Sequence, residues 1–285
     1  MKKSFLFAAV GVLGVAVLGV WMMSQSARTP QPGRPSGHEM ELNSASQPLS
    51  PSNPPAIASV ANATITLAVT NVAAVSDPAG KDKAALKIIL PPKLTSGTPK
   101  TVKNVNIAAD DPAITLKPRR PFFVPTGADV LLSAGKKVTS GDPVPPVIGS
   151  LDQITDGVKN GDDGYFVVLA PGKQWIQIDL GESCIISAIV MWHYHMASVV
   201  YRDVIVQVAD DPDFINNPKT LFNNDNDNTS GLGVGKDFEY FDMYEGKLID
   251  ANGINARFVR FYSCGNTTDD SNHYIEVEVY GKRVK

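Results

Sequence analysis

Hydrophobic and polar residues alternate with a period of two along short segments in the second half of the chain. Residues 175–180 read Trp-Ile-Gln-Ile-Asp-Leu, and residues 274–280 read Tyr-Ile-Glu-Val-Glu-Val-Tyr. A strand with one buried face shows this alternation because successive side chains point to opposite faces. Clusters of Gly, Pro, Asn and Asp separate such segments, and no long helical stripe occurs between them. The pattern predicts an all-β domain, folded as a sandwich or a barrel.

Eight segments in this half of the chain are rich in β-branched and aromatic residues, and we predict a strand in each. They are Asp129–Ala134, Tyr165–Leu169, Trp175–Leu180, Ile185–His193, Asp203–Ala209, Glu239–Tyr244, Ala256–Tyr262 and Tyr274–Tyr280. The connections over residues 141–164, 210–237 and 263–273 are too long for simple hairpins.

The N-terminus has a different pattern. Lys2 and Lys3 precede an apolar run from Phe5 to Met23, which is 19 residues long and about the length that spans a bilayer. Residues 1–27 are therefore predicted to be an uncleaved signal anchor or a cleaved signal peptide. Both alternatives place the remainder outside the cytoplasm, in the periplasm or at the cell surface.

Residues 28–125 lack the composition of a folded core. There is no aromatic residue from Ser24 to Pro121, so this stretch can bury little apolar area to offset the entropy of ordering. We predict a low-complexity, Pro-rich, disordered stalk over 28–125 and a single domain over 126–285. The apolar run from Ala84 to Leu90 could add a strand to the domain or dock a partner.

Charge differs between the two halves. Residues 126–285 carry 13 basic and 23 acidic side chains, so 13 − 23 = −10. An acidic domain is a poor partner for nucleic acid or anionic lipid and suits a hard cation such as Ca²⁺.

Six short motifs follow one another in this domain. They are Val138-Thr139-Ser140, Ile154-Thr155-Asp156-Gly157, the stretch from Trp175 to Gly181, the stretch from Arg202 to Asp211, the stretch from Ala256 to Tyr262, and the stretch from Glu276 to Gly281. Together they resemble the discoidin family, also called coagulation-factor type C or galactose-binding-domain-like modules, over about residues 126–285. The resemblance implies an eight-stranded jelly-roll β-sandwich. It also implies binding of glycans, lipid headgroups or proteins through loops at one end, and in many members a structural Ca²⁺.

An acidic turn in the second motif is the candidate calcium site. In the resembling family the Asp of this turn and a Glu at the start of the last strand ligate Ca²⁺ with backbone carbonyls, which implies Asp156 and Glu276 here. Asn160 and Asp162 follow closely and supply further oxygens for an ion that takes six to eight. The alternative is an Asp that caps its own turn. The run from Asn223 to Asn228 is read as a turn-forming loop or as a second cation site.

Three histidines and their aromatic neighbours form the candidate ligand site. On a strand His193 and His195 would face the same side, and His273 could approach them. The set could bind a sugar with aromatic faces and polar edges, hold Zn²⁺, or form a polar cluster satisfied within the protein. The ligand-binding candidates are Trp192, His193, Tyr194, His195, Tyr201, Arg202, Asn272 and His273.

These observations favour a binding protein over an enzyme. The chain has no G-x-S-x-G, H-E-x-x-H or phosphate-loop motif. We expect an extracytoplasmic, non-catalytic module that recognises carbohydrate or a glycosylated partner through loops at one end of a Ca²⁺-stabilised sandwich. The alternative is an envelope structural or adhesion protein that binds another exported protein. Cys184 and Cys264 could form one disulfide or stay as free thiols.

Overall fold

The computed structural model describes residues 82–93, 104–162 and 164–284. All of them belong to one compact unit, Ala68–Lys285. Among the described residues no helix has the length and apolar character needed to cross a membrane. The predicted anchor over residues 1–27 and the predicted stalk up to residue 81 lie outside the described residues.

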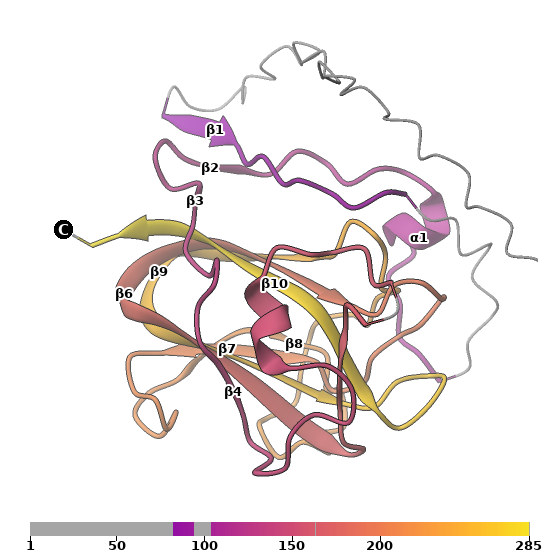
Figure 1. Ribbon diagram of the computed structural model, residues 1–285. Coiled ribbons are helices and arrows are strands. Elements are labelled where there is room, and N and C mark those ends of the chain that lie inside the picture. Colours follow the sequence, from indigo (N-terminus) through magenta and orange to yellow (C-terminus); the bar gives the residue numbers. More distant parts are fainter. Residues whose placement is uncertain (1–81, 94–103, 163, 285) are drawn as a thin grey trace, which may run out of the picture. The chain divides into compact units, whose positions relative to one another are not determined.

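Nearly all the regular structure is antiparallel β-strand (Figure 1). The strands are β1 Lys83–Ala85, β2 Phe123–Pro125, β3 Val130–Leu131, β4 Val138–Ser140, β5 Val167–Leu169, β6 Lys173–His193, β7 Ile205–Ala209, β8 Lys219–Asn223, β9 Lys247–Cys264 and β10 Asn272–Arg283. Helix α1 spans Pro112–Thr115, and one 3₁₀ turn spans Leu151–Thr155. The all-β, jelly-roll sandwich expected from the sequence is confirmed.

Two long strands, β6 and β9, run through both layers of the sandwich (Figure 1). Up to Asp179, β6 pairs with β4 and with the end of β9, and that part of β9 pairs with β7, which pairs with β8. A bulge lies between Asp179 and Cys184, where Gly181 has φ +90°. Beyond it β6 pairs with β10 and with the start of β9, and β10 also pairs with β3 and β5.

The core lies between these layers. Its fully buried side chains alternate along the strands, as the period-two pattern requires, and each stabilises the fold by about 1.5–3 kcal/mol through burial. They include Ile176 and Ile178 from the first part of β6, Ile189 and Met191 from its second part, Val259 and Phe261 from β9, and Val277 and Val279 from β10.

The strand predicted over Glu239–Tyr244 is wrong. Only Glu239 forms a bridge, to Ile107. The segment is extended, but Tyr240 packs into the main core while Phe241 packs into a separate cluster with Ala113. Its backbone bonds go to isolated partners instead of one neighbouring strand, because Glu239 N donates to the Asn106 carbonyl and Asp242 N donates to the Val199 carbonyl.

Residues 104–125, here called the arm, contact the sandwich. The side chain of Glu239 accepts a bond from Asn106 N, and that of Glu245 accepts one from Arg119 N at 3.2 Å. At the end of the arm, β2 pairs with β1, and Leu86, Ile88 and Phe122 pack against the outer face of β6 around Trp192. Part of the segment predicted as stalk thus covers one face of the sheet.

Both cysteines are free. Cys264 pairs in register with Lys173 at the start of β6, whereas Cys184 lies beyond the bulge and pairs with Ala256. The free-thiol alternative is the one the structure shows.

Gly246 gives a test of packing against Trp192. Its φ is +68°, and a Cβ there would lie 2.6 Å from the indole ring. Gly231 has a similar φ of +75° but open space around it. Gly246→Ala and Gly231→Ala should each cost about 1–2 kcal/mol for the left-handed backbone, and Gly246→Ala about 1–3 kcal/mol more for overpacking. Urea unfolding measures the loss in free energy of unfolding for each variant. Equal losses would show that the Trp192 indole moves aside at no cost.

Candidate functional site

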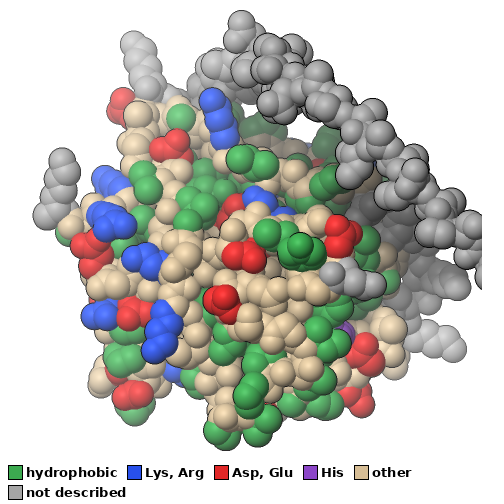
Figure 2. All heavy atoms as spheres, viewed as in Figure 1, with side chains coloured by type: hydrophobic (Ala, Val, Ile, Leu, Met, Phe, Trp, Pro, Cys, Tyr) green, Lys and Arg blue, Asp and Glu red, His purple; other side chains and the backbone are tan. Residues whose placement is uncertain are grey.

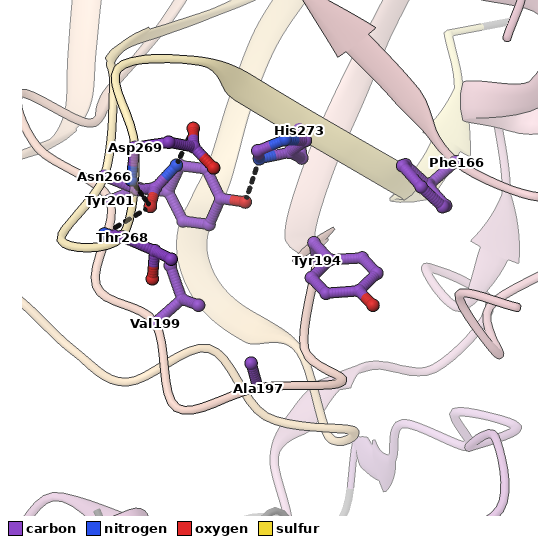
Figure 3. A pocket seen from close by; sticks show the side chains of 9 residues that line it. All are labelled: Phe166, Tyr194, Ala197, Val199, Tyr201, Asn266, Thr268, Asp269 and His273. Atoms are coloured by element: carbon purple, nitrogen blue, oxygen red, sulfur yellow. Dashed lines mark hydrogen bonds between the residues drawn. The ribbon is translucent and has the colours of Figure 1, made fainter. Parts of the chain in front are cut away.

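A hollow of about 160 Å³ opens where the end of β6, the start of β10 and the residues before β5 meet (Figure 3). Its lining combines apolar, aromatic and polar side chains: Phe166, Tyr194, Ala197, Val199, Tyr201, Asn266, Thr268, Asp269 and His273. Pockets that enclose a drug-sized ligand have about 300–1,000 Å³. This hollow therefore suits one ring of a larger molecule.

Four rings border the hollow, and the sheet register brings three of them, Phe166, Tyr194 and His273, together. His273 on β10 pairs with Val168 on β5, which places Phe166 near it, and Tyr194 directly follows the end of β6. The ring centroids of Phe166 and Tyr194 are 5.1 Å apart, and each lies 6.1–6.4 Å from the centroid of His273. These rings present an aromatic face to a ligand.

His273 and Tyr201 form one polar edge of the hollow. Tyr201 OH lies 2.8 Å from His273 Nδ1 (Figure 3). Burial, and then the nearby Asp242, raise the pKa of Tyr201, so the phenol keeps its proton. Burial also lowers the pKa of His273 despite the opposing effect of Asp269. With the phenol donating to Nδ1 of a neutral ring, Nε2 carries the hydrogen and, among the described residues, has no protein acceptor.

A short loop after β9 forms the other polar edge. The Asp269 carboxylate accepts bonds from Asn266 Nδ2 at 2.9 Å and Ser271 N at 2.8 Å, both on Oδ1. The Asn266 side-chain oxygen in turn accepts from Thr268 N and Asp269 N. Local bonds therefore hold the loop, while Asp269 itself stays exposed and its Oδ2 receives no donor among the described residues.

Three of the eight predicted ligand-binding residues line this hollow: Tyr194, Tyr201 and His273. Asn272 is fully buried and supports the loops, since its Oδ1 accepts from Gly265 N and its Nδ2 donates to the Ala170 and Gly172 carbonyls. Arg202 is exposed outside the lining.

Trp192, His193 and His195 are buried and have partners within the protein. Trp192 Nε1 donates to the Tyr244 carbonyl at 2.9 Å. His193 Nδ1 lies 3.3 Å from Asp242 Oδ1, and the ring stacks on Tyr201 at a centroid distance of 4.2 Å. His195 Nε2 lies 2.8 Å from the Lys159 carbonyl. The histidines form no metal-binding group within the described part of the chain, where only three aspartates come close enough.

Sequence reasoning missed Phe166, Asn266, Thr268 and Asp269. Phe166 is brought in by the pairing of β5 with β10, which no local pattern shows. The other three lie in the connection over residues 263–273, whose length was the one signal that it could have a role.

The acidic turn that holds Asp156 contacts the last strand at Glu276, but within the described residues Asp156, Asp162 and Glu276 do not form a metal-binding group of carboxylates. Gly157 N donates to Glu276 Oε2 at 3.0 Å, which joins the acidic turn to the last strand. Asp156 is exposed, and its Oδ1 accepts from Val158 N at 2.8 Å, the bond of an Asp that caps its own turn. The side chains of Asn160 and Asp162 are bonded to each other.

Glu276 is almost fully buried. Burial raises its pKa to about 9, and the nearby Glu278 and Asp156 act in the same direction. Glu278 is already bonded to Lys159 Nζ at 2.6 Å and to Tyr280 OH at 2.7 Å. Glu276 forms no ion pair within the described residues.

A second acidic group, Asp203, Asp225 and Asp227, lies in and near the predicted Asn/Asp loop. Asp225 is fully buried and accepts bonds from the backbone of Thr229 and Ser230 and from the Ser230 hydroxyl. Its oxygens are thus used to fold the loop, as in the turn-forming alternative.

No protein-family model and no curated protein sequence matches the chain. Among solved structures, a chitosan-binding module from a chitosanase/glucanase of Paenibacillus sp. IK-5 is 19% identical at a TM-score of 0.39, over 53% of this chain and 99% of that module. CpGH89CBM32-4 of Clostridium perfringens, in complex with GlcNAc-α-1,4-galactose, is 14% identical at 0.39, over 53% and 94%. A family 89 glycoside hydrolase of the same organism is 18% identical at 0.41, over 54% of this chain but only 15% of the enzyme. At these identities the similarity concerns the fold alone.

Glu276 predicts a pH dependence of stability in metal-free buffer. The unfolded chain loses this proton near pH 4.5, whereas the folded protein holds it to about pH 9. As pH rises between these values, the contribution of Glu276 to the free energy of unfolding therefore falls. Glu276→Gln should become progressively more stable than the wild type over this range. Urea unfolding in EDTA measures it, with the exposed Glu182→Gln as control, and a constant difference would contradict the assignment.

Proposed function

We propose that the chain is a non-catalytic carbohydrate-binding module that acts outside the cytoplasm. The observation that carries this proposal is the hollow itself, in which the rings of Phe166, Tyr194 and His273 meet the polar edge formed by Tyr201, Asn266 and Asp269. An aromatic face beside a few fixed polar groups is the arrangement that a sugar ring needs, because a sugar has apolar C–H faces and a polar rim.

The charge of the hollow restricts the class of sugar that it can bind. Asp269 is the one lining side chain with a full charge, and no Lys or Arg contributes to the lining. The face drawn in Figure 2 shows acidic and basic side chains interspersed, without a continuous basic patch. The ligand proposed is therefore a neutral or positively charged sugar at the end of a glycan, rather than an acidic one.

We further propose that Ca²⁺ stabilises the contact between the acidic turn at Asp156 and strand β10. Asp156 and Glu276 would hold the ion together with carbonyls of the turn. The side chains of Asn160 and Asp162 would break the hydrogen bond between them and bind the ion instead. The fit is supported by Glu276, a buried carboxyl that has no ion-pair partner among the described residues and whose pKa is raised to about 9, chiefly by burial. The ion would supply a positive charge beside this carboxyl and fix the turn to β10.

Substitutions in the hollow test sugar binding. Phe166→Ala removes an aromatic face and His273→Ala removes a polar edge, and each should weaken binding about tenfold or more. Calorimetry against a panel of neutral, amino and acidic sugars, including GlcNAc-α-1,4-galactose, measures this. Ile215→Ala, which removes an apolar side chain that is 78% exposed and lines neither this hollow nor the other cavities described, is the control. Binding that survives both substitutions would place the site elsewhere, and the absence of any binder would reject the proposal.

Calcium addition tests this contact. An ion that binds only the folded chain at 100 times its Kd stabilises it by about 2.7 kcal/mol. Ca²⁺ should raise the Tm of the wild type, whereas Asp156→Asn and Glu276→Gln should lose most of the rise. Asp129→Asn, at an exposed position away from the turn, should keep it. An unchanged Tm in millimolar Ca²⁺ would reject this part of the proposal.

A further inference from the structure

A second and larger cavity lies between the arm and the sandwich. It has about 520 Å³ and shares no lining residue with the hollow described above. We call it the arm cleft. Residues 108–120 form one wall, and the other wall comes from Phe222, Lys247 and residues 237–240. Its volume lies within the range of ligand pockets.

The carboxylates in the arm cleft are mostly occupied by backbone donors. Asp111 Oδ1 accepts from Ala113 N at 2.8 Å, Asp237 Oδ2 accepts from Asn223 N at 2.7 Å, and Glu239 Oε2 accepts from Asn106 N. These bonds anchor the arm and the loop before β9. Three of the four carboxylates that line the cleft thus help to hold its walls, whereas the fourth, Asp110, is exposed.

The ammonium group of Lys247, in contrast to these carboxylates, has no hydrogen-bond partner among the described residues. Nζ lies 4.4 Å from the ring centroid of Tyr240 and 4.7 Å from that of Phe222. Among the described residues it has no hydrogen-bond acceptor and no carboxylate within ion-pair distance. Burial lowers the pKa of Lys247 even though Asp111, Asp237 and Asp242 act against it. The ammonium is therefore partly removed from water without a hydrogen-bonded or ion-paired partner among the described residues.

Other features of the cleft favour an anionic ligand with a ring. Lys117, Arg119 and Arg120 also line it, and one Arg119 nitrogen donates to the Gly246 carbonyl at 3.2 Å. Phe238 lies at its rim with 51% of its surface exposed. A planar or cyclic body can pack on this ring while a charged group reaches Lys247.

We infer that the arm cleft binds a small organic monocarboxylate, with its carboxylate at Lys247 and its ring against Phe238. A single negative charge fits better than a dianion, because Asp111 and Asp237 remain near the ammonium and repel additional charge. This site is independent of the proposed sugar site, since the two cavities have no residue in common.

Ligand-detected NMR and calorimetry at low ionic strength test the site. The probes are D-glucuronate and benzoate, which present a carboxylate on a sugar and on an aromatic ring, with D-glucose as the neutral counterpart of the first. At least one carboxylate should bind, and Lys247→Met should weaken it tenfold or more. Lys247→Arg, which keeps the charge, should retain more than Lys247→Met, and Phe238→Ala should weaken the benzoate arm.

The controls separate this site from the first. Lys236→Met removes an exposed ammonium outside the cleft, and His273→Ala alters only the sugar hollow, so neither should change carboxylate binding. Loss of binding in His273→Ala, unchanged binding in Lys247→Met, or no binding of either carboxylate would overturn the inference. Inorganic phosphate binding as tightly as the carboxylates would overturn the assignment to a monocarboxylate.

Discussion

The ladder between β6 and β9 is the interaction on which the rest of the structure depends. It runs from Lys173 paired with Cys264 to Met191 paired with Lys247, and it is interrupted by two irregularities. Because each strand contributes to both layers, one set of backbone hydrogen bonds fixes the register of the whole sandwich. The bulge after Asp179 lets the same strand turn from the first layer into the second.

The hollow follows from this ladder because most of its residues lie at or near strand ends. Tyr194 directly follows β6, the loop with Asn266 and Asp269 directly follows β9, and His273 lies at the start of β10. Side chains at the ends of paired strands are held by the rigid sheet even though they belong to loops or borders. The side chains that line the hollow are therefore already held in place by the sheet.

The fold class was readable from the sequence because period-two alternation reflects burial of one strand face, which is a local property. The sequence did not predict that β6 is continuous, because Gly181 with its neighbours looks like a turn between two strands. The sequence did not predict the burial of Trp192 either. Leu86, Ile88 and Phe122 cover the outer face of β6, and they are too distant in sequence for residues 185–193 to indicate this contact.

The candidate site shows the same division. His273 and Tyr194 were found because His273 was expected to approach His193 and His195 and Tyr194 lies between those two, whereas Phe166 depends on the register of β5 against β10. Asp156 and Glu276 were paired through a family resemblance, and the bond from Gly157 N to Glu276 shows that the turn holding Asp156 contacts the last strand, while the Asp156 side chain bonds to its own turn. Asn160 and Asp162 illustrate the limit of sequence proximity, because side chains close in sequence can bond each other.

The pairing of β1 with β2 has a mechanical consequence. The chain enters this ladder at Lys83 and leaves it toward the sandwich at Pro125, and these two residues are paired with each other. Tension applied between the residues before Lys83 and the domain would therefore separate the two strands sequentially, one residue pair at a time, starting from Lys83 and Pro125. Such a connection yields at low force and releases length while the long β6–β9 ladder stays intact.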